Sequence, residues 1–281
     1  ITANMYHNSG ISVELSATSS VPVGAISGKF TINASGDQVY FSQGNLQYQA
    51  STSTWQFAEY QYDRIGNANL GISETYDGWI DLFGWGTSGY DNTPNDAYAV
   101  NYQPWSVDYD DVNADFNANG YGPSTNMPDP NLVGTSASYD WGVYNAISNG
   151  GNQNGLWRTL TNDEWSYLIA NHTKGKSTVN GISGWVLRPY GVITDVATSY
   201  TAEDWVAEEA AGSVFLPTTG FRGYNASVDN LEVNNQGFYW SSTHYDSYQS
   251  YNLQFWGNDI DMQSGGDRCY GFAVRLVCPA E

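Results

Sequence analysis

Positively charged residues are scarce in this chain of 281 residues. Nine Lys and Arg stand against 29 Asp and Glu, and the formal net charge is −20. A surface of that sign repels phosphate backbones and anionic lipid headgroups at long range. No apolar run reaches the length that spans a bilayer. We therefore expect neither nucleic acid binding nor membrane insertion by this chain, and its first residues, neither basic nor hydrophobic, suggest no targeting segment.

Cysteine and histidine are rarer still, with two and three residues. If residues 269–278 form one strand, the Cα atoms of Cys269 and Cys278 lie about 30 Å apart at roughly 3.3 Å per residue, whereas a disulfide needs about 5.5 Å. We expect two unpaired thiols. The three histidines, His7, His172 and His244, are too scattered in the sequence to predict an iron site.

Aromatic residues and glycine are abundant instead. Aromatics make up 15% of the chain, there are 30 Gly, and only 14% of residues are charged. The polar surface must therefore consist largely of Asn, Ser, Thr, Gln and Tyr, the residue types that antibody paratopes use for stiff, amphipathic contact. A turn-rich β protein with tyrosines on solvated strands explains the same composition, and both interpretations stay open.

The hydrophobic pattern divides the chain into segments. Residues 1–27 are loosely patterned and predict a lead-in or linker, and one domain is expected over 28–281. Its short alternating runs, separated by Gly, Asn and Ser, indicate β-strands. Residues 87–140 form a polar insertion, and the alternation returns over 237–277. The final run, 272–277, is apolar on both sides and predicts a strand buried on both faces.

Two helices are marked at their N-termini. Thr161 and Glu164 form the pattern of a capping box, in which the hydroxyl and the carboxylate each accept from a backbone amide. A second helix is predicted from Thr201, with Asp204 at its third position, to Gly212. Both segments are amphipathic, so both helices should pack on a β core.

Four motifs occur in a fixed order along residues 28–281. They are Trp157-Arg158-Thr159-Leu160-Thr161 with Glu164-Trp165, Ala210 to Arg222, Gly237-Phe238-Tyr239-Trp240-Ser241-Ser242, and Gly271-Phe272-Ala273-Val274-Arg275-Leu276-Val277. The series resembles bacterial surface proteins with the C-type-lectin fold of the formylglycine-generating-enzyme type, which include the variable proteins of diversity-generating retroelements and related major-paralogue domains. The resemblance implies an α+β fold of small antiparallel sheets, two amphipathic helices and long ordered loops.

The resemblance also implies where a ligand would bind. In such proteins the segment between the third and fourth motifs, here residues 243–272, carries the binding face, and the motifs form its rigid ends. Its polar and aromatic residues are the candidate ligand-binding set: His244, Tyr248, Asn252, Gln254, Trp256, Asn258, Asp259, Asp261, Asp267 and Tyr270. Retroelement mutagenesis does not produce Gln or Trp codons, so Gln254 and Trp256 leave open whether the gene is actively diversified or encodes a fixed paralogue.

Catalytic chemistry is not expected. The enzymes of this family use a Cys-x4-Cys pair, whereas Cys269 and Cys278 are nine residues apart, and no carboxylate pair stands in a glycosidase motif. No cofactor is expected. Asp115, Asn117 and Asn119 match the first half of a calcium loop, but Asn126 occupies the twelfth position where a bidentate Glu is needed. A solvated acidic loop is the main interpretation there, and a bound calcium ion is the alternative.

These observations predict a secreted or cell-surface ligand-binding protein, adhesin-like or receptor-like, and therefore an extracellular location. The expected partner is a protein or a glycan on another cell or on a phage. Two alternatives remain: a structural subunit of a fimbria or surface fibre, and a glycan-processing enzyme.

Overall fold

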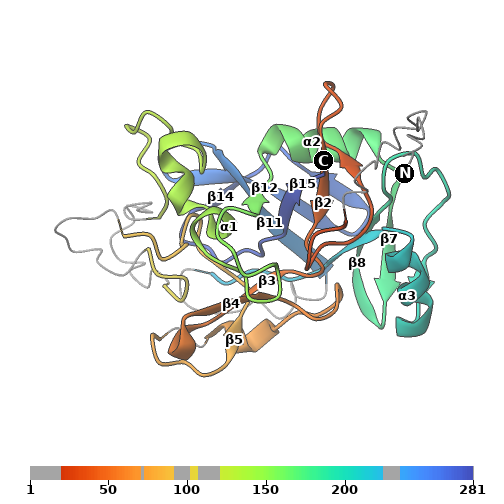
Figure 1. Ribbon diagram of the computed structural model, residues 1–281, viewed down its shortest axis with the longest axis horizontal. Coiled ribbons are helices and arrows are strands. Elements are labelled where there is room, and N and C mark those ends of the chain that lie inside the picture. Colours follow the sequence, from red (N-terminus) through yellow and green to blue (C-terminus); the bar gives the residue numbers. More distant parts are fainter. Residues whose placement is uncertain (1–19, 71–72, 92–101, 107–120, 224–234, 281) are drawn as a thin grey trace, which may run out of the picture.

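The computed structural model describes residues 20–70, 73–91, 102–106, 121–223 and 235–280. Short, mostly antiparallel sheets dominate it, with few helices, so the chain has an α+β fold (Figure 1). One four-stranded sheet joins the two ends of the described chain. In spatial order its strands are β1 (Phe30–Thr31), β2 (Gln38–Phe41), β15 (Leu276–Pro279) and β6 (Arg158–Thr159).

Two further sheets flank this one. The first contains, in spatial order, β10 (Val214–Pro217), β8 (Ile182–Leu187), β7 (Lys174–Val179) and β9 (Ser199–Tyr200), of which only β9 pairs in parallel. The second is small and lies at one side of the molecule (Figure 1). It contains β4 (Thr54–Phe57), β3 (Leu46–Gln49) and β5 (Trp79–Ile80). The remaining sheet, which carries the candidate site, is described below.

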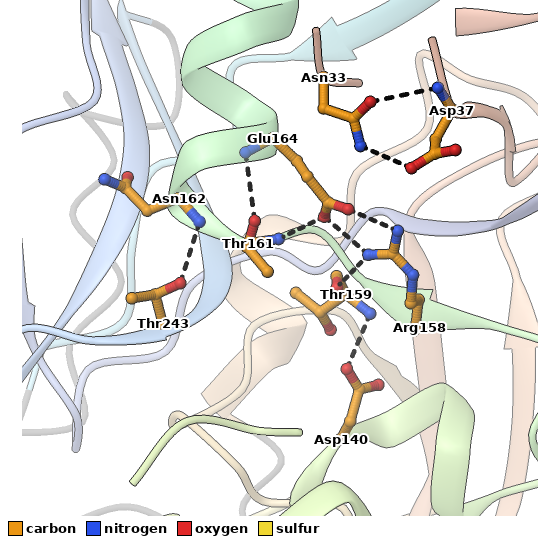
Figure 2. A network of polar contacts seen from close by, with 9 residues as sticks. All are labelled: Asn33, Asp37, Asp140, Arg158, Thr159, Thr161, Asn162, Glu164 and Thr243. Atoms are coloured by element: carbon orange, nitrogen blue, oxygen red, sulfur yellow. Dashed lines mark hydrogen bonds and ion pairs between the residues drawn. The ribbon is translucent and has the colours of Figure 1, made fainter. Parts of the chain in front are cut away.

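Helix α2 (Asn162–Asn171) begins with the predicted capping box. Thr161 Oγ1 accepts from Glu164 N at 3.2 Å, and Glu164 Oε2 accepts from Thr161 N at 2.8 Å (Figure 2). Arg158 on β6 holds both oxygens of the same carboxylate at 2.7 Å. Asn162 N donates to Thr243 Oγ1 at 3.0 Å, which ties the start of the helix to the strand that enters the candidate site.

The second predicted helix is also present, as α3 (Ala202–Ala210). Thr201 and Asp204 form its capping box, and Gly212 follows the helix with a φ of 88°. Both helices place a fully buried tryptophan on the sheets, Trp165 from α2 and Trp205 from α3. The remaining helical segments are short: α1 (Trp141–Tyr144), η1 (Ala50–Thr52), η2 (Gly66–Leu70) and η4 (Gly134–Tyr139).

Strand β11 (Gln236–His244) separates the two largest apolar clusters. Phe238 and Trp240 point into one cluster and Tyr239 into the other, because successive side chains of a strand leave opposite faces. The ring nitrogen of Trp240 donates to the carbonyl of Phe83 at 2.7 Å. In the opposite direction, the ring nitrogen of Trp85 donates to the carbonyl of Ser241 at 2.8 Å. Ser241 and its neighbour Ser242 are fully buried, as expected for a rigid end of the binding segment.

The final apolar run is buried on both faces, as predicted, but it does not form one strand. Ala273 exchanges backbone hydrogen bonds with Phe238 and Trp240 on β11. Further along, β15 begins at Leu276 and pairs with β2 and β6. The run is divided because its pairing partner changes along its length. Cys269 and Cys278 are both buried, and no disulfide joins these two described residues.

The lead-in is described from residue 20. From Gly24 onward it already belongs to the hydrogen-bonded fold, because Gln43 N donates to the Gly24 carbonyl at 2.7 Å and Ile26 N to the Phe41 carbonyl at 2.8 Å. The polar insertion is described at 87–91, 102–106 and 121–140, where the fully buried Tyr121 shares a hydrogen bond of 3.0 Å with Ser106. Within the described chain, no helix is long and apolar enough to span a bilayer.

Candidate functional site

The sheet that carries the candidate site consists of β11, β12 (Gln249–Trp256), β13 (Asp259–Asp261) and β14 (Gly265–Asp267). Its register puts Gln254 opposite Phe238 on one side and Asp261 on the other. Directly paired residues share a face of a sheet. Asn252 and Trp256 lie on the same face by alternation along β12, as the sequence predicted. We call this the pocket face.

A pocket of about 260 Å³ opens on the pocket face. Its wall combines aromatic rings, uncharged amides and a single carboxylate. The residues that line it are Phe221, Phe238, Gln249, Asn252, Gln254, Gly265, Gly266, Asp267, Tyr270 and Phe272. Four of the ten predicted ligand-binding residues, Asn252, Gln254, Asp267 and Tyr270, are therefore brought together.

The aromatic wall is assembled from three separate segments. Phe238 comes from β11, Phe221 from the segment after β10, and Tyr270 and Phe272 from the segment before β15. The rings of Phe238 and Phe272 stack with centroids 4.9 Å apart. The Phe221 ring meets Phe238 edge-on, with centroids 5.3 Å apart, and is tilted against the Tyr270 ring, with centroids 5.5 Å apart. Phe238 and Phe272 are buried beneath, whereas Phe221 and Tyr270 are half-buried at the rim.

In the polar wall each amide donates one hydrogen bond within the protein. Gln249 Nε2 donates to Asp267 Oδ1 at 2.8 Å, and Asn252 Nδ2 donates to the Ser264 carbonyl at 3.1 Å. Gln254 Nε2 makes a longer contact of 3.4 Å with Gln236 Oε1. Asn252 Oδ1 is buried and has no hydrogen-bond partner, although Asn252 is only 1% exposed. The wall therefore contains a buried acceptor oxygen that accepts from no described residue.

Two glycines allow β14 to come this close. A Cβ atom at Gly266 would collide with the Phe272 ring, and one at Gly265 would stand 2.6 Å from Gln249 Oε1. Only glycine leaves the backbone room to approach at such positions. The Gly-Gly pair before Asp267 is a signal of this close approach that sequence reasoning missed.

A buried arginine fixes the loop that joins β11 to β12. The Arg268 guanidinium donates to the carbonyl oxygens of Asp246 at 2.9 Å and Pro123 at 3.0 Å and lies over the Trp85 ring, 4.5 Å from its centroid. Burial lowers the pKa of Arg268 to about 10, which leaves it charged at neutral pH. Asp246 also accepts from the backbone amides of Tyr248 and Gln249. This loop is thus held from beneath at one end of the pocket.

The other predicted residues lie outside the pocket. Trp256 and Asp259 are paired at the far end of the pocket face, where both are exposed, and Asp261 is half-buried beside Gln254. Asn258 is exposed in the turn between β12 and β13. Tyr248 is exposed in the loop before β12 and does not line the pocket.

His244 contacts a different segment. Its Nδ1 lies 2.8 Å from Asn131 Oδ1, which also accepts from the His244 backbone amide at 3.0 Å. Burial, and secondarily the charge of Arg268, lower the pKa of His244, so its neutral form is favoured. It connects the end of β11 to the polar insertion and does not line the pocket.

The calcium prediction at Asp115, Asn117 and Asn119 lies outside the described residues. Elsewhere in the described chain, no group of three or more His, Cys, Asp or Glu side chains is arranged to hold a metal ion. Asp129, close to this region, uses Oδ2 to accept from the backbone and the hydroxyl of Thr135, both at 2.8 Å. These bonds lower the pKa of Asp129 and stabilise the turn before η4.

A family model described as a domain of unknown function (DUF8237) matches residues 187–277, about a third of the chain. The match begins in β8 and includes every residue that lines the pocket. No curated protein and no solved structure matches the chain. The pocket thus lies wholly within the segment of this protein that is similar to that family.

Proposed function

We propose that this protein is a secreted or cell-surface ligand-binding protein, built on a C-type-lectin-like scaffold, that binds its ligand in the pocket of the β11–β14 sheet. The small antiparallel sheets, the two capped helices and the order of the four motifs support this scaffold. The partner is a protein or a glycan on another cell or on a phage, and the role is that of an adhesin or receptor.

The composition of the pocket carries the proposal. Ligand sites are typically concave and largely apolar, with a few polar groups that orient the ligand. The pocket combines four aromatic side chains with three amides, and Asn252 keeps an acceptor buried without a partner inside it. An unsatisfied buried acceptor costs about 1–3 kcal/mol. A ligand that donates to this oxygen would recover that cost.

The neighbouring surface extends the same chemistry. Trp256 is 38% exposed at the far end of the pocket face, with Asp259 opposite it. Exposed aromatic side chains next to a pocket supply large contact area at low cost in conformational entropy. The binding face therefore consists of the pocket and of this rim along the β12–β13 hairpin.

Two substitutions of the same type test the proposal. The wild-type protein is screened against glycan arrays and intact bacterial cells, and each partner found is measured again with Gln254→Ala, in the pocket, and Gln153→Ala, in an exposed loop far along the chain. Gln254→Ala should raise the Kd about tenfold, which corresponds to a loss of about 1.4 kcal/mol of binding free energy. Gln153→Ala should leave the Kd unchanged. Equal binding by both variants would place the ligand elsewhere.

A further inference from the structure

The pocket contains acceptor oxygens that no donor of the described protein occupies. Each of its three amides already donates within the protein, from Gln249 to Asp267, from Asn252 to the Ser264 carbonyl and from Gln254 to Gln236. Asn252 Oδ1 has no partner. An ionised carboxylate accepts through both of its oxygens, and Gln249 occupies only Oδ1 of Asp267. The group that fits this wall must bring its own donors.

The pocket is also negatively charged. Asp267 is the only Asp, Glu, His, Lys or Arg among its lining residues. Across the described residues, no lysine or arginine forms an ion pair with Asp267. Arg268 follows it in the chain, but its guanidinium donates to the backbone carbonyls of Pro123, Asp246 and Gln249 and packs on Trp85. The whole chain carries a net charge of −20, which adds to the attraction of a cation.

We propose that the pocket recognises a primary ammonium group carried on an apolar stem. This inference rests on the proposed function and names the chemistry of its ligand. An ammonium group has three donors and no acceptor, which matches Asn252 Oδ1 and Asp267 Oδ2. The stem lies along the aromatic wall, as methylene chains of lysine do on apolar surfaces, and ring faces that meet the cation attract it.

Other ligand classes fit less well. An anionic sugar or a phosphate would meet the Asp267 carboxylate with no cation in the wall to offset it. A neutral sugar would leave the Asp267 carboxylate without a cationic partner, since none of the described residues supplies one. A lysine side chain of a partner protein carries its ammonium group on such a stem, whereas an amino sugar of a glycan carries it on a hydroxylated ring, and the experiment separates these two sources.

The test uses ligands matched in shape. The full chain is titrated with Nα-acetyl-lysine methylamide and with its norleucine counterpart, which lacks only the ammonium group, while the side-chain amide signals of Asn252 and Gln254 are followed by NMR. Methyl glucosaminide and methyl N-acetylglucosaminide form the second pair. An ammonium ligand should shift both signals with a Kd on the order of 1 mM, and its neutral counterpart should bind at least about tenfold more weakly.

Two variants then test the carboxylate. Asp267→Asn keeps the shape of the side chain and should weaken the ammonium ligand about tenfold, whereas Asp77→Asn, an exposed site that changes the net charge equally, should not. Binding by the lysine derivative and not by its norleucine counterpart would indicate a protein source. Binding by glucosaminide alone would indicate a glycan and would overturn the apolar stem. Equal losses in the two variants would overturn the inference in favour of overall charge.

Failure of this inference can be told from failure of the proposed function. If the neutral ligands shift the pocket signals as strongly as the charged ones, the pocket binds ligands but the ammonium assignment is wrong. If none of the four ligands shifts the signals, the ammonium assignment is also wrong. The glycan and cell screens with Gln254→Ala then decide independently whether the pocket is the binding site.

Discussion

Two carboxylates in this protein differ in how their charge is used. Glu164, at the start of α2, accepts from both terminal nitrogens of Arg158 and from the backbone of Thr161 (Figure 2). Asp267, on β14, accepts from the amide of Gln249 and has no cationic partner among the described residues. The charge of Glu164 is neutralised inside the fold, whereas that of Asp267 remains available in a pocket. The comparison distinguishes a residue that stabilises the scaffold from one that can bind.

Two tryptophans differ in the same way, one buried in the scaffold and the other exposed at the surface. Trp240 is fully buried, stacks on Phe272 with centroids 4.3 Å apart and donates to a backbone carbonyl. Trp256, sixteen residues further along the same hairpin, is 38% exposed. Large side chains of one type thus serve the core at one end of the site and the surface at the other.

The largest expected effect is on the scaffold side of the comparison. Trp240→Ala or Leu276→Ala should lower the free energy of unfolding by about 2–5 kcal/mol, because each removes fully buried apolar volume that the surroundings cannot refill. Urea denaturation of the purified variants measures this. Losses below about 1 kcal/mol would show that the two motifs are not the rigid ends of the site.

The paired carboxylate gives the next effect. Glu164→Ala removes the capping box and leaves Arg158 without its carboxylate partner, and it should cost about 2 kcal/mol of unfolding free energy. Glu164→Gln retains an acceptor for the Thr161 amide but loses the charge, and it should cost about half as much. A cost near zero for Glu164→Gln in urea denaturation would indicate that charge pairing contributes nothing here, whereas equal costs for the two variants would assign the whole effect to the charge.

A buried carboxylate elsewhere in the scaffold gives a pH dependence. Burial raises the pKa of Asp140 to about 6, against the hydrogen bonds from Gly142 and Thr159 that favour its ionised form. The folded state therefore retains a proton that the unfolded state releases near pH 4, so this contribution to stability is largest below pH 4 and is lost as pH rises through 6.

Denaturation at pH 4.5 and 6.5 tests this for wild type and Asp140→Asn. The wild type should lose stability relative to the variant, on the order of 1 kcal/mol, as pH rises over this range. Subtracting the unfolding free energy of the variant from that of the wild type removes the contribution of the other carboxylates, which both proteins share. A difference of the opposite sign would mean that Asp140 ionises more easily in the fold than in the unfolded chain.

The smallest effects on stability are expected at the exposed aromatics. Tyr248→Ala and Trp256→Ala should change the free energy of unfolding by no more than about 0.5 kcal/mol, since both side chains are substantially exposed. Binding of the ligand should nevertheless weaken by about 2 kcal/mol at a hot spot. Because Tyr248 lies outside the pocket and Trp256 on its face, a larger binding loss for Trp256→Ala sharpens the assignment.

Local patterns in the sequence predicted local structure well. The capping boxes at Thr161 and Thr201 depend on residues three positions apart, and both are present. Alternation along β12 placed Asn252, Gln254 and Trp256 on one face, and the register confirms it. Each of these features is fixed by the geometry of a single helix or strand.

Contacts between distant segments could not be predicted. Phe221 reaches the pocket from the segment after β10, and Asn131 reaches His244 from the polar insertion, so neither contact leaves a periodic signal. The long strand expected over 272–277 was divided for the same reason, because its pairing partners lie far away in the sequence. Only the Gly265–Gly266 pair gave a local hint of the close approach that shapes the pocket.

Asn252→Leu tests the central claim most directly. The substitution keeps a side chain of similar size and removes both a buried acceptor that has no partner and the Nδ2 bond to the Ser264 carbonyl, which keeps a contact of 3.4 Å with the Asn252 backbone amide. Because the two losses act in opposite directions, the unfolding free energy should stay within about 1 kcal/mol of wild type. Binding to the partner identified in the screens, and to the ammonium ligands, should fall at least about tenfold. A variant that is destabilised by more than about 2 kcal/mol and still binds with wild-type affinity would contradict the account, because Asn252 would then belong to the scaffold.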